Sequence, residues 1–123
     1  MNVRVAKRLH DALVAAQRID RYVQGRTYDA YVADDYFRSA VERQFEVISE
    51  ALRIAVATDD GDEILAAIPQ VPKIIGLRNR IAHSYDVLDD EIIWRAAVVE
   101  IPTLLPQLEE VLGDFDLPAD FSD

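Results

Sequence analysis

The chain has 123 residues, half of them hydrophobic, with four glycines, five prolines and no cysteine. This length suits one domain with one core. The absence of cysteine excludes disulfide bonds and thiolate metal sites, and it fits a reducing cytoplasm. The net charge of −10 argues against a general affinity for nucleic acids. However, residues 1–57 carry nine basic and eight acidic residues, so the acidity lies in the second half and a local basic cleft stays possible.

An apolar stripe predicts a first helix over about residues 5–23. Its members recur every three or four positions: Val5, Leu9, Ala12, Ala16, Ile19 and Val23. No apolar run approaches the roughly 20 residues that a membrane helix needs, so we expect no membrane partner. Gly25 should end the helix, Thr27 should cap a short helical turn, and Asp34 or Asp35 should cap the next helix.

The second long helix, about residues 35–57, is apolar on two sides and is therefore expected at the centre of the fold. One stripe consists of Phe37, Val41, Phe45, Ile48 and Leu52, and the other of Ala40, Val47, Ala51 and Ile54. A polar line runs between them: Ser39, Arg43, Glu46, Glu50 and Arg53. Such a line is typical of a solvated face with charge pairs three and four residues apart.

Capping residues and prolines divide the rest of the chain into shorter helices. Asp62 should cap a helix that ends near residue 68, and Pro72 suits the first turn of a helix over residues 73–83. Asp89 or Asp90 should cap a last helix over residues 91–112, with Trp94 as its packing anchor.

Two further signals concern the end of the chain. We expect a kink or break of the last helix near Pro102, and Gly113 should end that helix. No strand-like alternation occurs, and the connections are short. The sequence therefore predicts an all-α, antiparallel bundle of four to five helices as a single domain over residues 1–113. Residues 114–123 would form an acidic, flexible tail or a partner-binding arm.

The candidate functional segment is LRNRIAHSYD, residues 77–86, at the end of a predicted helix. On an ideal helix, Arg78 and His83 are about 140° apart, whereas Asn79 and Arg80 share a face with His83. Arg78 and His83 could still meet if the helix loosens near His83. They could also meet if two copies of the helix pack across a two-fold axis and share one cleft.

These residue types are suited to phosphodiester cleavage. A histidine can move a proton between two oxygens, and an arginine can hold a phosphate and stabilise charge that develops in the transition state. With RNA, the neighbouring 2′-OH can be the nucleophile, so neither a metal nor a cofactor is needed. The alternative is structural: Arg78 and His83 as ion-pair partners at a helix end, and Tyr85 as a core aromatic residue.

Other chemistries find no support in the sequence. The second histidine, His10, lies on the first helix beside Asp11, where we expect it at the surface. Two histidines without cysteine do not make a His-rich metal site. No phosphate-binding glycine loop, dinucleotide fingerprint, zinc-protease motif or nucleophile elbow is present.

The chain resembles the HepT family of the HEPN superfamily. Arg78, His83 and Tyr85 match its R-x4-H-x-Y pattern. The stretches RIDRYVQGRTYDAYVADD, AVERQFEVISEAL and IIGLRNRIAHSYDVLDDEIIW also look like the family's first-helix end, central helix and motif helix. The central stretch includes a recurrent Glu-Ala pair, here Glu50–Ala51. The resemblance covers roughly residues 9–112, which makes it far more specific than the short motif.

The resemblance implies a HEPN-like bundle that forms a homodimer around the motif helices. Such proteins are toxins that cleave RNA without a metal, and a nucleotidyltransferase antitoxin of the MntA kind silences them by transferring AMP to the motif tyrosine. The assembly with that antitoxin could be a larger hetero-oligomer. Carried over, Arg78, His83 and Asn79 would be catalytic, and Tyr85 would be the AMP acceptor. The alternative is a non-catalytic HEPN module that scaffolds a nucleotidyltransferase.

Two points beside the motif concern charge. Arg80 would either hold a substrate phosphate or form a salt bridge with Glu46 or Glu50 across the bundle. After Tyr85 the chain continues with acidic residues where many relatives are aromatic or rich in glycine. These carboxylates, Asp86, Asp89 and Asp90, are expected to weaken RNA affinity.

Overall fold

Helices account for nearly all of the described chain. The structure is a computed structural model, and it describes residues 1–82 and 87–113. Its elements are α1 (Val3–Val23), α2 (Tyr28–Ala33), α3 (Asp35–Val56), α4 (Gly61–Ala67), α5 (Val71–Ala82), α6 (Val87–Arg95), the π-helical segment η1 (Ala96–Glu100) and α7 (Ile101–Leu112). No strand occurs within these described ranges, which confirms the predicted all-α class.

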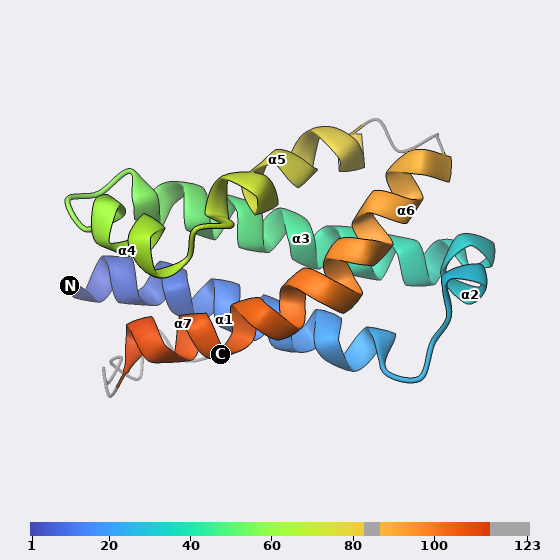
Figure 1. Ribbon diagram of the computed structural model, residues 1–123, viewed down its shortest axis with the longest axis horizontal. Helices are drawn as coiled ribbons and strands as arrows, with labels where there is room; N and C mark the ends of the chain where they lie inside the picture. The colour runs from blue at the N-terminus through green and yellow to red at the C-terminus, as the bar shows by residue number, and fades with distance from the viewer. Residues whose placement is uncertain (83–86, 114–123) are drawn as a thin grey trace.

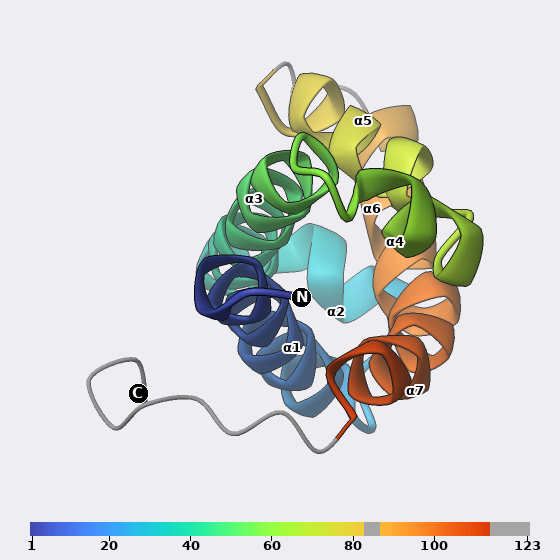
Figure 2. The ribbon, with the colours of Figure 1, turned by 90° about the vertical axis from the view of Figure 1, so that its left-hand side faces the viewer.

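The long helices form an antiparallel bundle (Figure 1). α1 and α3 run side by side in opposite directions, α5 lies along α3, and α6, η1 and α7 form one bent rod that returns along α1. Seen end-on, these four units surround the centre of the molecule, and α2 lies across the far end (Figure 2). The most extensive helix contacts join α1 with α3, and then α1 with α7 and α3 with α5.

The predicted apolar stripes form the core. All six stripe residues of α1 and all five of the first stripe of α3 are buried. In the second stripe of α3, Ala51 is buried and the other three residues are half-buried. α3 contacts α1, α2, α4 and α5, so the prediction that it is the central element is confirmed. Its two apolar sides hold α1 on one side and α5 on the other (Figure 2).

An aromatic cluster joins α2, α3 and α6. The ring of Trp94 lies 5.3 Å from that of Tyr31 and 5.9 Å from that of Phe37, between ring centroids. Tyr31 is fully buried, and this burial raises the pKa of its hydroxyl. The prediction that Trp94 anchors the last helical segment is confirmed.

Capping hydrogen bonds and backbone angles confirm several predicted helix ends. The Thr27 side chain accepts a hydrogen bond from the Ala30 N–H at 3.1 Å, and Asp34 accepts one from the Phe37 N–H at 3.1 Å. Gly25 has φ +68°, a conformation that favours glycine just beyond a helix end. Gly113 has φ +54° and closes α7.

Two predicted caps are wrong. α4 begins at Gly61 with Asp60 at the N-cap position, two residues earlier than a cap by Asp62 would give, and a turn in which the Gly61 N–H bonds to the Thr58 carbonyl leads directly into it. α6 begins at Val87, so Asp89 and Asp90 lie in its first turn. Carboxylates there also stabilise the helix, because they interact favourably with its dipole. α5 likewise begins at Val71, two residues before the predicted start.

The expected irregularity near Pro102 is present as the π-helical segment η1. There the Ile101 N–H bonds to the Ala96 carbonyl five residues back, immediately before the proline that cannot donate such a bond. None of the helices within the described ranges is long and apolar enough to cross a membrane. The predicted tail, residues 114–123, lies outside the described residues.

Candidate active site

The structure describes some of the predicted site residues and not others. Arg78, Asn79 and Arg80 lie in the last turns of α5, and all three are exposed. His83 and Tyr85, together with Asp86, lie outside the described residues. The described part of the site is therefore the exposed end of α5 and the groups that α3 and α6 place beside it.

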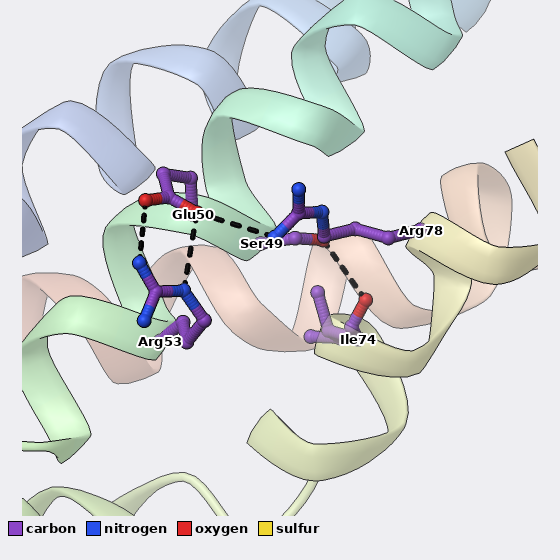
Figure 3. Close-up of polar contacts among 5 residues, drawn as sticks. All are labelled: Ser49, Glu50, Arg53, Ile74 and Arg78. Carbon is purple, nitrogen blue, oxygen red and sulfur yellow. Dashed lines mark hydrogen bonds and ion pairs between the residues drawn. The ribbon is translucent and has the colours of Figure 1, made fainter. Parts of the chain in front are cut away.

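α5 is fixed to the central helix one turn before Arg78. The Ser49 hydroxyl of α3 donates a hydrogen bond to the Ile74 carbonyl of α5 at 3.1 Å, in a fully buried position (Figure 3). Ile74 and Leu77 are buried on the same side of α5. Because a buried side-chain hydrogen bond and an apolar contact act together here, the rotation of α5 about its axis is well defined.

That rotation brings Arg78 to a carboxylate of α3. Arg78 Nη1 lies 3.2 Å from Glu50 Oε2, and the same carboxylate accepts two hydrogen bonds from Arg53, at 2.7 and 3.2 Å (Figure 3). The hydrogen bond from Arg53, followed by the charges of Arg53, Arg78 and Arg8, lowers the pKa of Glu50 below its usual value. Glu50 is therefore an ionised group shared by two guanidinium groups, and this array carries a net positive charge.

The side chains in this array remain accessible. Half of the Arg78 side chain (51%) is exposed, and Glu50 is 45% exposed. An arginine that is held by one carboxylate oxygen and is half-exposed keeps N–H donors free for a phosphate oxygen. The array can thus bind an anionic substrate without first breaking all of its internal contacts.

Arg80 has a different partner from the one predicted. It lies 3.2 Å from Asp89 of α6, a carboxylate that is only 13% exposed, so the predicted salt bridge to Glu46 or Glu50 is wrong. Two residues of an α-helix turn through about 200°, so Arg78 and Arg80 point to opposite sides of α5. Arg78 faces α3, and Arg80 faces α6. One of the carboxylates expected to repel RNA, Asp89, is thus paired with a cation.

Sequence reasoning missed the role of Glu50 toward Arg78. The charge pair between Glu50 and Arg53 was visible as a three-residue spacing on one helix. The contact with Arg78 joins two helices and depends on their relative rotation, which no local pattern encodes. The signals in the sequence were that Glu50 belongs to the polar line of α3 and to the Glu50–Ala51 pair of the family resemblance, and neither names Arg78 as its partner.

Two remaining observations concern histidine and metal binding. His10 is half-buried, and its Nδ1 has no hydrogen-bond partner, so the expectation that it lies at the surface is wrong. Within residues 1–82 and 87–113, no three histidine, cysteine, aspartate or glutamate side chains are grouped so that they could hold a metal ion.

Comparison with known proteins identifies the family. The model of the family described as Ribonuclease HepT-like matches residues 12–111. A candidate RNase of Methanocaldococcus jannaschii is 28% identical over 110 residues, which covers 88% of this chain and 87% of that protein. A candidate RNase of Caldanaerobacter subterraneus subsp. tengcongensis is 30% identical over 92 residues, covering 73% and 78%.

A probable ribonuclease HepT of Thermococcus cleftensis is 22% identical over 105 residues, covering 84% of this chain and 91% of that protein. No solved structure matched the chain at a significant level. The family match spans most of the chain and includes the helix that carries Arg78. The chain therefore belongs to the HepT-like ribonuclease family.

Proposed function

We propose that this protein is a metal-independent endoribonuclease that acts in the cytoplasm as the toxin of a toxin–antitoxin pair. The observation that carries the proposal is the half-exposed Arg78, held by Glu50 at the end of α5, in a chain of the HepT-like ribonuclease family. The names of the relatives, candidate RNases and a probable ribonuclease HepT, support RNA as the substrate.

In the proposed reaction the RNA supplies its own nucleophile. His83 accepts the proton of a 2′-OH group while that oxygen forms a bond to the adjacent phosphorus. The bond from phosphorus to the 5′-oxygen of the next nucleotide breaks, and the proton passes to this leaving oxygen. Arg78 binds the non-bridging phosphate oxygens, whose negative charge grows in the transition state. The products are a 2′,3′-cyclic phosphate and a 5′-hydroxyl end, and no metal is needed.

The two neighbours of Arg78 serve substrate binding and orientation in this proposal. Asn79 is exposed and orients His83 or a phosphate oxygen. Arg80 is half-exposed in its contact with Asp89, and it binds a second phosphate with the donors that Asp89 leaves free.

Regulation of the toxin would act on Tyr85. A partner nucleotidyltransferase antitoxin would transfer AMP to the Tyr85 hydroxyl, which adds negative charge and bulk where the RNA phosphate must bind. The protein would act as a homodimer around the α5 helices, and the complex with the antitoxin could be a larger hetero-oligomer. Toxicity in cells that is relieved by the co-expressed antitoxin, with a matching gain in the mass of the Tyr85 peptide, would support this part.

The decisive experiment is RNA cleavage in excess EDTA. Wild type, checked by intact mass to be free of AMP, and His83→Ala are incubated with a pool of tRNA and total RNA. We expect cleavage by the wild type alone, with cyclic phosphate ends. An unmodified, dimeric wild type that leaves RNA intact would instead favour a non-catalytic module that scaffolds a nucleotidyltransferase. Loss of the dimer in His83→Ala would also favour that alternative.

A further inference from the structure

A second basic surface lies at the start of α1, away from the predicted motif. The first ten residues contain Arg4, Lys7 and Arg8 and no acidic residue, although the whole chain carries a net charge of −10. Lys7 is paired with Asp11 at 2.7 Å. Arg4 and Arg8 are exposed and form no hydrogen bond or ion pair with other residues of the described ranges. Their charges are thus available to an anionic ligand.

These cations border a groove between α1 and α3. The groove has a volume of about 710 Å³. Arg4, Lys7 and Arg8 line it from α1, and Ile54, Ala55 and Thr58 line it from the end of α3 and the residues after it. The floor is therefore mostly apolar and the α1 side is cationic. A groove of this kind suits a chain that has charged phosphates and flat apolar bases.

Arg8 connects the groove with the array around Arg78, because it lines the groove and its charge acts on Glu50. α1 and α3 are antiparallel neighbours (Figure 1), so Arg8 lies near Glu50, and the charge of Arg8 contributes to the lowered pKa of that carboxyl. Arg53, which Glu50 binds directly, is followed in the chain by Ile54 of the groove lining. We call this succession of cations, Arg78, Arg53, Arg8 and Arg4, the basic path. It crosses α5, α3 and α1 in turn.

Acidic residues limit the basic path. Within it, Glu50 is the one carboxylate that the structure shows bound to its cations, and that carboxylate is shared by two arginines. Asp59 and Asp60 follow Thr58, so the path should end at that point. Phosphates of a strand would therefore meet a net positive charge from Arg78 to Arg4 and a negative charge beyond it.

We propose that Arg4 and Arg8 bind backbone phosphates of single-stranded RNA whose scissile phosphate lies at Arg78. This inference rests on the proposed function, because it places the cleaved phosphate at the motif. It adds a binding site on α1 that extends the footprint of the substrate across the bundle. An acidic protein that needs to hold RNA can do so only where its few cations are collected, and the basic path is such a place.

The test compares two double variants of equal charge. Arg4→Gln/Arg8→Gln removes the end of the basic path. Arg18→Gln/Arg21→Gln, the control, removes two cations from the same helix about 20 Å farther along. Binding is measured by fluorescence anisotropy with a labelled single-stranded 2′-O-methyl RNA, which lacks the free nucleophile and is not cut, over a series of salt concentrations. Circular dichroism and thermal melting check that both variants fold.

Arg4→Gln/Arg8→Gln should weaken RNA binding about 25-fold at about 0.1 M salt, and the slope of log K against log salt should fall by about 1.4, since each lost phosphate contact contributes about 0.7. In cleavage assays its KM should rise while kcat stays near that of the wild type. The control variant should stay within about twofold of the wild type. Equal losses in both variants, or no loss in either, would overturn the basic path.

The same data separate this inference from the proposed function. If the wild type cleaves RNA and the KM of Arg4→Gln/Arg8→Gln is unchanged, the proposed ribonuclease activity is supported and RNA binding along the basic path is contradicted. If RNA binding depends on Arg4 and Arg8 but no RNA is cleaved, binding along the basic path is supported and the proposed ribonuclease activity is contradicted. A wild type that neither binds nor cleaves RNA overturns both.

Discussion

In the proposed reaction, Glu50 would have two opposing effects on a phosphate at Arg78. Its carboxylate holds Arg78 in one direction by a contact of 3.2 Å, which prepares the guanidinium for the transition state. The same carboxylate places a negative charge next to the phosphate and so weakens binding of RNA. Removing the charge should therefore separate binding from catalysis, which makes Glu50 a positioning residue with a characteristic kinetic effect.

We expect Glu50→Gln to lower kcat about tenfold, because Arg78 loses its fixed partner, while KM for RNA falls, because a repulsive charge has gone. Steady-state cleavage of a single RNA oligonucleotide measures both constants. The control is Glu46→Gln, which removes the same charge from an exposed position one turn earlier on α3. A kcat that stays unchanged in Glu50→Gln would contradict the positioning role.

The pH dependence gives a second check on this residue. The lowered pKa of Glu50 means that its carboxylate stays ionised even as the pH falls below its ordinary pKa of 4.5. Its contacts with Arg53 and Arg78 therefore stabilise the fold at neutral pH and are lost only as the pH falls through the lowered pKa. A step in cleavage between about pH 5 and pH 8 must come from another group, so that step should persist in Glu50→Gln.

At the level of helices, sequence patterns predicted the long elements well. The stripes of α1 and α3 follow from burial of one or two helix faces, and the Thr27 and Asp34 caps satisfy backbone donors in ways that local sequence encodes. The starts of α4 and α6 were mispredicted because aspartates are abundant there and several could serve as caps. At α4, the turn in which the Gly61 N–H bonds to the Thr58 carbonyl set the actual start.

The charge partners that α5 meets on its neighbours could not be predicted from the sequence. The exposure of Arg78, Asn79 and Arg80 follows from the apolar spacing of Ile74 and Leu77, yet the partner of each arginine does not. Glu50 and Asp89 lie 28 and 9 residues from their respective partners along the chain. Such pairs are set by the contact of α5 with α3 and α6, which includes the buried hydrogen bond from Ser49.

Gly61 shows how packing decides a helix start. A Cβ atom at this position would lie 2.0 Å from the Val56 carbonyl oxygen, so no larger side chain fits without a shift of the backbone. We expect Gly61→Ala to lower the free energy of unfolding by about 1–3 kcal/mol, as overpacking does in a rigid site. Guanidinium denaturation measures the change, and RNA cleavage by the folded variant should persist.

Gly76 provides the matched control for Gly61. It lies inside α5, and a Cβ atom there would meet nothing within 4 Å. Inside a helix, alanine is more favourable than glycine by about 1 kcal/mol, so Gly76→Ala should stabilise the protein. If Gly61→Ala also stabilised the protein, helix propensity would outweigh the contact with the Val56 carbonyl, which would contradict the prediction for Gly61.

At the level of the whole molecule, the direction of Arg78 bears on how many copies make one site. Arg78 is held against α3, and on an ideal helix a residue five positions later is rotated by about 140° from it. An ideal helix continued beyond Ala82 would place that position away from the side that faces α3. In a two-fold dimer around the α5 helices, each cleft would then receive Arg78 from one protomer and His83 from its partner.

Complementation tests this arrangement directly. Arg78→Ala and His83→Ala chains are co-expressed with different tags, and the heterodimer is isolated by two successive affinity steps. In a shared cleft, one of the two sites has both mutations and the other has none, so the heterodimer should regain about half of the wild-type cleavage. Each variant alone should be inactive. A dimer whose sites each lie within one chain would lack Arg78 in one site and His83 in the other, so a purified heterodimer without activity would assign both groups to the same protomer.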